Sequence, residues 1–175
     1  MNEHTKILSE LFKSIDKSEI KSILDAGSGK TSLGSLIKEF PDSEIDAIIY
    51  YNDERKKNSI KENIKSDKYS LYEMDIVKDT IGKEYDLGLA HLLLGEAIKW
   101  GNSFENLLDK LLKIKSKYLV IVDIKEDKSI DFEYLENKIK SKYNILKKTE
   151  IHKENPQEFD DFIAENYVGY VIRKK

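Results

Sequence analysis

The chain has 175 residues, of which 39% are hydrophobic and 36% are charged, and its formal net charge is −3. A chain of this length removes roughly 70% of its unfolded surface from water, so we expect one domain over residues 1–175. The absence of cysteine excludes disulfides, thiol nucleophiles and thiolate metal sites. Since only His4, His91 and His152 could offer imidazole ligands, we expect no metal centre.

Charge and hydropathy also limit the partners. The negative net charge argues against a whole-molecule electrostatic grip on nucleic acid, and we interpret the lysine clusters at 110–117 and 138–148 as solvated faces of surface elements. No apolar run approaches the ~18 residues that span a bilayer, and the first ten residues do not resemble a secretory signal. We therefore expect a cytoplasmic protein without a membrane segment, and the oligomeric state is not readable.

The predicted elements alternate along the chain. Apolar residues at helical spacing predict an N-terminal helix within residues 1–18 that packs on the core. Apolar and β-branched runs predict seven strands, at 22–26, 44–51, 69–75, 85–90, 117–124, 143–151 and 166–174. Helical patterns fall between them at 33–40, 52–64, 103–114 and 132–139, and none falls between the last two strands.

This alternation is typical of an α/β doubly wound sheet that is mostly parallel, with helices on both faces. The last two strands are expected to pair antiparallel at the edge of the sheet. Ligands of such sheets bind beyond the carboxyl ends of the strands, near the point where the strand order reverses. We therefore expect the site around Gly27, Tyr50, Asp75 and residues 90–96.

The stretch ILDAGSGKTSLG, residues 23–34, has two interpretations that lead to different proteins. Gly29, Lys30 and Thr31 match the end of a triphosphate-binding loop, with Asp123 as a candidate magnesium acid, but Leu24 stands where that loop needs its first glycine. A dinucleotide fingerprint would place Ser32 at its third glycine and lacks the acid that follows the second strand. Neither motif is complete.

An apolar strand that runs into D-x-G-x-G, here residues 24–29, resembles the first motif of the class I S-adenosylmethionine-dependent methyltransferases. The resemblance continues in order through Asp75 after the third strand, residues 83–97 at the fourth strand, the fifth strand, and the final strand ENYVGYVIRKK. It implies a seven-stranded sheet of order 3-2-1-4-5-7-6 with an antiparallel last strand. It also implies S-adenosylmethionine as the cofactor.

Site residues follow from this resemblance. Glycines without Cβ let the backbone approach a ligand, and the next helix begins with N–H groups that suit a carboxylate. The implied cofactor-binding residues are Asp25, Gly27, Ser28, Gly29, Tyr50, Tyr51, Asp75, Ile76, Ala90 and His91. His91 and Glu96 are the candidate catalytic bases. Two positions depart from the family, since Thr31 replaces its third glycine and Tyr50 replaces the acid that grips the ribose hydroxyls.

The resemblance implies methyl transfer to an oxygen or nitrogen nucleophile of a small molecule or RNA. Methylation of DNA bases is disfavoured, because residues 90–93 read AHLL rather than the [DN]-P-P-[FY] of amino-methylating enzymes. Two alternatives stay open: a degenerate, non-catalytic binding module of the same fold, and a triphosphate-binding protein that uses GKTS.

Three further expectations concern the surroundings of the site. A lid could come only from the N-terminal helix or from residues 95–102 and 151–162. Trp100 is expected to pack under the next helix. Gly27→Val is expected to abolish cofactor binding while leaving the fold largely intact.

Overall fold

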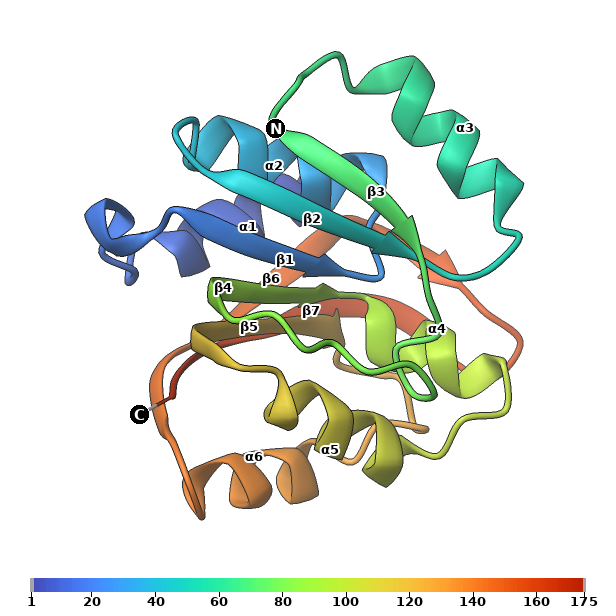
Figure 1. Cartoon of the computed structure of the whole chain (residues 1–175). Helices are drawn as coiled ribbons and strands as arrows, with labels where there is room; N and C mark the ends of the chain where they lie inside the picture. Colours follow the sequence, from blue (N-terminus) through green and yellow to red (C-terminus); the bar gives the residue numbers. More distant parts are fainter. Residues whose placement is uncertain (1, 175) are drawn as a thin grey trace.

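A computed structural model describes residues 2–174, so Met1 and Lys175, at the ends of the expected domain, lie outside the described residues. The described chain alternates between strands and helices (Figure 1). The strands are β1 Ser22–Ala26, β2 Glu44–Ile49, β3 Tyr69–Glu73, β4 Tyr85–His91, β5 Ser116–Ile124, β6 Asn144–Glu158 and β7 Ile163–Arg173. The helices are α1 Glu3–Phe12, α2 Lys30–Glu39, α3 Glu54–Asn63, α4 Leu93–Lys99, α5 Phe104–Lys113 and α6 Phe132–Lys140, with a short 3-10 helix at Lys17–Glu19.

The seven strands form one sheet of order β3-β2-β1-β4-β5-β7-β6, as predicted. Strands β1 to β5 pair in parallel, whereas β7 pairs antiparallel with both β5 and β6. The order reverses at β1, whose two neighbours are β2 and β4. The carboxyl ends of β1 and β4, where Ala26 pairs with Ala90, therefore mark the place for a ligand.

Helices cover both faces of the sheet and give it two hydrophobic cores (Figure 1). One core contains α1, α2 and α3, with Ile23 of β1 and Leu89 of β4 facing it. The other contains α4, α5 and α6 and takes the alternate residues, such as Leu24 and Ala90. Because successive strand residues point to opposite faces, continuous apolar runs serve both cores.

Several boundaries differ from the predictions. The N-terminal helix occupies only Glu3–Phe12 and begins at the cap Asn2, whose side chain accepts from the Thr5 N–H. The second strand ends at Ile49, because Tyr50 and Tyr51 enter a turn where Asn52 has a positive φ. The predicted third and fourth strands match β3 and β4 within two residues, and Asp75 lies just beyond β3.

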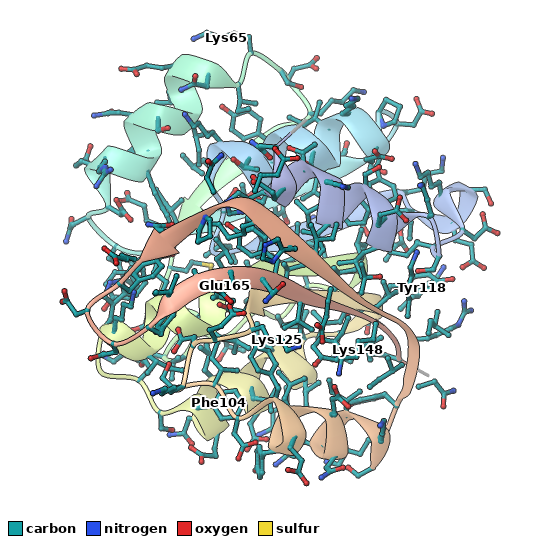
Figure 2. All side chains as sticks on the ribbon, turned by 180° about the vertical axis from the view of Figure 1, so that it is seen from behind. Lys65, Phe104, Tyr118, Lys125, Lys148 and Glu165 are labelled. Atoms are coloured by element: carbon teal, nitrogen blue, oxygen red, sulfur yellow. The ribbon has the colours of Figure 1, made fainter. Side chains whose placement is uncertain are left out.

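The largest differences lie at the C-terminal hairpin and after β4. Strand β6 continues to Glu158 and β7 begins at Ile163, so most of residues 151–162, considered above for a lid, belong to β6, whose pairing with β7 is irregular between His152 and Gln157. Seen from behind, the hairpin runs as a long ribbon across the molecule (Figure 2). Helix α4 follows β4 almost directly and was not predicted as a helix.

None of the helices formed by residues 2–174 has the length and apolar character needed to cross a bilayer. Within the same residues, no three His, Asp or Glu side chains are grouped as metal ligands would be.

Candidate functional site

The turn between β1 and α2 is built around Gly27. This glycine has a φ of +72°, a left-handed conformation that L side chains rarely adopt, and it directs the chain sharply out of the strand. The Ser28 N–H then donates to the Ile48 carbonyl at 2.6 Å, and Gly29 caps α2 with its own N–H donating to Ser32 Oγ at 3.1 Å. The glycines therefore form a tight turn at the carboxyl end of β1.

Beneath this turn lies the carboxyl group of Asp25, fully buried. Its Oδ2 accepts from Ser28 Oγ at 2.5 Å and from Ser32 Oγ at 2.8 Å, which ties the strand end to the loop and to α2. Its Oδ1 is buried and has no hydrogen-bond partner. Burial raises the pKa of Asp25 to about 6 against the opposing effect of the two hydroxyls. Asp25 thus holds the loop and leaves one acceptor atom unused.

A cavity of about 270 Å³ opens above the turn. Its lining includes Gly27 and Gly29 of the turn, Lys56 of α3, His91 at the end of β4, Glu96 of α4, and His4 of α1. Lys56 Nζ and Glu96 Oε2 form an ion pair at 2.8 Å across the cavity, joining α3 to α4. Residues far apart in the sequence therefore meet at the strand ends where the ligand site was predicted.

His91, one of the two candidate bases, lies in this cavity and is almost wholly buried. Its Nε2 lies 3.1 Å from Nδ1 of His4, whose Nε2 lies 2.8 Å from the Tyr167 hydroxyl. Burial lowers the pKa of His91 to about 3, and the positive charge of Lys56 and the charge that a protonated His4 would carry act in the same direction. Its imidazole is therefore neutral at pH 7 and a weak base. His4 was missed as a site residue, because a lone histidine near the start of an amphipathic helix gives no signal in the sequence.

Tyr50 and Tyr51 stand outside the cavity lining. The Tyr50 ring packs on Trp100 with ring centroids 4.7 Å apart and an interplanar angle of 31°. The Tyr51 hydroxyl donates to Asp79 Oδ2 at 2.7 Å. Trp100 is 42% exposed, so the prediction that it packs under the next helix is wrong. It follows α4 directly and lies on Tyr50 instead.

The remaining predicted residues make structural contacts and do not line the cavity. Asp75 Oδ1 accepts from the N–H groups of Val77 and Lys78, at 2.9 and 3.2 Å, so this oxygen caps its own turn. Ile76 and Ala90 are buried in the core beneath α4. Of the predicted residues, the structure brings Gly27, Gly29, His91 and Glu96 together around the cavity. It places Asp25 and Ser28 just beneath them and leaves the others out of the lining.

Helix α4 packs closely on the glycine turn. Leu92 has a φ of +56°, which turns the chain abruptly out of β4, and a Cβ added to Gly27 would lie 2.6 Å from Leu93 Cδ1. The structure therefore argues against the expectation that Gly27→Val leaves the fold largely intact, which stays a prediction. A side chain there meets both an unfavourable φ and Leu93. At Gly29 an added Cβ would have nothing within 4 Å, so this is the glycine that faces open space.

The candidate magnesium acid of a triphosphate site is engaged elsewhere. The carboxylate of Asp123 is buried and accepts from the N–H groups of Leu94 and Gly95 at 3.0 and 3.3 Å, so it caps α4. Burial raises the pKa of Asp123 to about 7, against the opposing effect of these N–H groups. Lys30 and Thr31 form the first turn of α2 and line the cavity.

A larger surface cavity, of about 510 Å³, lies at the opposite edge of the sheet, around the amino ends of β4 and β5. Its buried lysine, Lys174, already donates to the Ile114 carbonyl, and Lys117 pairs with Asp86 at 3.5 Å. It contains none of the predicted site residues. We regard the smaller cavity as the candidate site, because ligands of doubly wound sheets bind at the carboxyl ends of the strands.

The sequence matches no protein-family model and no curated protein sequence. Solved structures do match. The StiE O-MT, residues 942–1257, superposes with a TM-score of 0.68 at 16% identity, over 97% of this chain and 73% of that one. The N-methyltransferase NodS from Bradyrhizobium japonicum WM9, in complex with S-adenosyl-L-homocysteine, gives 0.68 at 12% identity over 98% and 85%.

A putative RNA methyltransferase, PH1948 from Pyrococcus horikoshii, gives a TM-score of 0.67 at 14% identity, over 97% of this chain and 82% of that one. Nearly the whole chain therefore has the fold of the class I S-adenosylmethionine-dependent methyltransferases. At these identities the likeness is one of fold.

Proposed function

We propose that this protein is an S-adenosylmethionine-dependent methyltransferase that acts on an oxygen or nitrogen nucleophile of a small molecule. One observation carries the proposal. This protein has a methyltransferase fold, and its cavity opens at the carboxyl ends of β1 and β4, where the glycine turn and His91 line it. This is where doubly wound sheets bind their ligands.

The residues around the turn fit the amino-acid end of such a cofactor. Gly29 leaves open space where any other residue would place a Cβ. The first N–H groups of α2 have no partner within the helix and suit a carboxylate, and Lys30 adds a positive charge beside them. The unpartnered Oδ1 of Asp25 is an acceptor directly beneath the turn. Glycine, helix N-terminus and acid together would hold the methionine part.

The adenosine end of the cofactor fits only after α4 and Trp100 move. The cavity of about 270 Å³ lies just below the roughly 300–1,000 Å³ that ligand pockets usually span, and Leu93 covers Gly27. Trp100 covers Tyr50, the residue that replaces the ribose-binding acid. We propose that α4 and Trp100 shift outward when the cofactor binds, with Tyr50 then facing the ribose.

When bound, S-adenosylmethionine supplies a methyl group already activated on a sulfonium. The chain has to align the acceptor and exclude water. His91, buried and neutral, would contact the acceptor from the end of β4. Glu96 is held in place by Lys56 at 2.8 Å and is the second polar group that would face the acceptor. His4 closes the cavity from the side of α1.

A small molecule suits the site better than RNA. The lysines of the two clusters are largely paired with acids: Lys138 with Asp109 at 2.9 Å, and Lys140 and Lys148 with Glu136 at 3.6 and 2.5 Å. Lys148 lies on the hairpin beside α6 (Figure 2). Such paired lysines give little net positive potential, and none of them lines the cavity.

A second candidate function is a non-catalytic binding module of the same fold. Leu93 on Gly27 and Trp100 on Tyr50 favour it, because both fill space next to the turn in the structure as it stands. In that case α4 would keep its position and the adenosine end would have no place.

Calorimetric titration of the pure protein separates these functions. S-adenosylmethionine and S-adenosylhomocysteine should bind and raise the melting temperature, since a ligand that binds only the folded state stabilises it. Binding of ATP with magnesium alone would overturn the proposal in favour of a triphosphate site. No binding by any of the three would favour the non-catalytic module.

The Gly29→Val variant tests whether the cofactor binds at the glycine turn. The side chain fits the extended backbone of Gly29, with φ −142°, and fills the open space above the turn, so cofactor binding should be lost with the fold retained. Gly82→Val is the matched control, because Gly82 also has nothing within 4 Å of an added Cβ and lies outside the cavity. Unchanged affinity in Gly29→Val would show that the site is elsewhere.

A further inference from the structure

Four polar side chains from four different elements form one chain of hydrogen bonds that ends in the candidate site. Lys153 Nζ of β6 donates to the Tyr167 hydroxyl of β7 at 2.8 Å. That hydroxyl lies 2.8 Å from His4 Nε2 of α1, and His4 Nδ1 lies 3.1 Å from His91 Nε2. Lys153 and Tyr167 are both more than nine-tenths buried.

The chemistry of these four groups fixes which partner donates in each hydrogen bond. An ammonium only donates, so the Tyr167 oxygen accepts from Lys153. The Tyr167 O–H then needs an acceptor, and among residues 2–174 its one remaining hydrogen-bond partner is His4 Nε2. A neutral His4 that accepts at Nε2 carries its hydrogen on Nδ1 and donates it to His91. His91 Nε2 is thus an acceptor.

The direction of the chain leaves His91 with its hydrogen on Nδ1. Among the described residues this nitrogen has no hydrogen-bond partner, and His91 lines the cavity. We propose that Lys153, acting through Tyr167 and His4, holds His91 as a hydrogen-bond donor to the methyl acceptor, and that the acceptor is therefore an oxyanion, a carboxylate or an ionised phenol. This rests on the proposed methyltransferase function.

A donor at this position discriminates between nucleophiles. An oxyanion can accept a hydrogen bond with one lone pair and attack the methyl carbon with another. A neutral amine has one lone pair, and an N–H that occupies it would block attack. In the transfer, the C–O bond forms as the C–S bond breaks and its electron pair stays on sulfur, which becomes a neutral thioether. An acceptor that is already ionised releases no proton, so His91 need not act as a base.

Lys153, Tyr167 and His4 act through another residue and are positioning residues. The charges that face the two histidines come from several elements: Lys153 from β6, Lys56 from α3 and Glu3 from α1. Glu96 of α4, paired with Lys56 at 2.8 Å, adds a second acid at the cavity, so the direction of the hydrogen bonds and not the balance of charge is what selects the acceptor.

The hydrogen position on His91 is measurable without cofactor or activity. Two-bond ¹H–¹⁵N correlation spectra of the full chain, labelled with ¹⁵N-histidine, distinguish the two neutral tautomers. We expect His91 to carry its hydrogen on Nδ1, assigned by comparison with His91→Gln. A hydrogen on Nε2 in the unmodified protein would overturn the proposal.

Lys153→Glu should reverse the direction of all three hydrogen bonds between Lys153 and His91. Its carboxylate accepts from the Tyr167 O–H, so Tyr167 then accepts from His4 and His4 from His91, whose hydrogen moves to Nε2. Lys6→Glu is the control, because it makes the same charge change at an exposed position of α1 and should leave the tautomer unchanged. Lys153→Met, which only removes the donor, serves if the glutamate prevents folding, and it should yield a mixture of tautomers. An unchanged His91 in a folded Lys153 variant contradicts the proposal.

Acetate and methylammonium are small enough to probe the cavity. Acetate should shift the His91 resonances saturably, and methylammonium should not. In Lys153→Glu the affinity for acetate should fall by about tenfold or more, as expected for loss of one hydrogen bond to a charged group. Equal responses to both ions would refute an oxyanion site. Failure of S-adenosylmethionine to bind by calorimetry would instead refute the proposed function and leave these spectra unaffected.

Discussion

Replacing Asp25 with asparagine should change how stability depends on pH. The group is fully buried and its pKa is raised from 3.8 to about 6, so the folded protein holds this proton more tightly than the unfolded chain does. Asp25 therefore contributes stability that is complete below pH 3.8 and is lost as the pH rises through 6. A pKa shift of this size corresponds to a loss of about 3 kcal/mol of unfolding free energy at pH 8.

The amide of the Asp25→Asn variant would have no such ionisation. Urea unfolding followed by circular dichroism, at pH steps from 4 to 8, gives the free energy of unfolding of both proteins. The difference, variant minus unmodified protein, should rise by about 2–3 kcal/mol over this range. Any cost of the amide hydrogens adds a constant, and the raised pKa of Asp123 cancels because both proteins share that residue. A difference that stays constant with pH would refute the reasoning.

Three other changes test the surroundings of the cavity. Gly27→Ala should cost about 2–4 kcal/mol of unfolding free energy, from the positive φ and from Leu93, whereas Gly29→Ala should cost about 1 kcal/mol or less; equal urea midpoints would contradict this. The pKa of His91 is lowered from 6.5 to about 3, so the stability that neutral His91 contributes is lost as the pH falls below 6.5. Between pH 7 and pH 5, the free energy of unfolding of His91→Gln in urea should therefore fall by about 2 kcal/mol less than that of the unmodified protein. If α4 moves on binding, Trp100→Ala should raise the affinity for S-adenosylmethionine in calorimetry by up to about tenfold, because the contact with Tyr50 no longer has to be broken; a weaker affinity would argue against the movement.

The strands and helices were predictable from the sequence because each carries its own local pattern, and the order of the sheet was implied by the resemblance to the methyltransferase family. The run from Ile23 to Ala26 is apolar except for Asp25, and it is followed at once by Gly27 and Gly29. Such a pattern marks a buried parallel strand that turns into a helix, whatever the rest of the chain does. The same holds for the paired edge strands, since no helical pattern separates them. The place of the site followed from the sheet order.

The contents of the site depend on contacts between distant segments, which no local pattern reports. His4 reaches His91 only because α1 packs on the end of the sheet, and the pair is joined to Tyr167 and Lys153 by the hairpin beneath it. Asp75 illustrates the opposite case: its position matches the family motif, yet its Oδ1 caps the following turn. Helix α4 escaped prediction because a seven-residue helix that starts from a left-handed Leu92 lacks both length and a polar cap.

By itself, therefore, the sequence determined the strands, the helices and the glycine turn, since these depend on periodicity and on backbone conformations that few residues adopt, whereas the order of the sheet was implied by the resemblance to a known family. Only the tertiary structure decided which side chains line the cavity, how far α4 closes it, and in which direction its hydrogen bonds run. Those properties arise from packing and burial between residues such as His4 and His91, 87 positions apart in the chain.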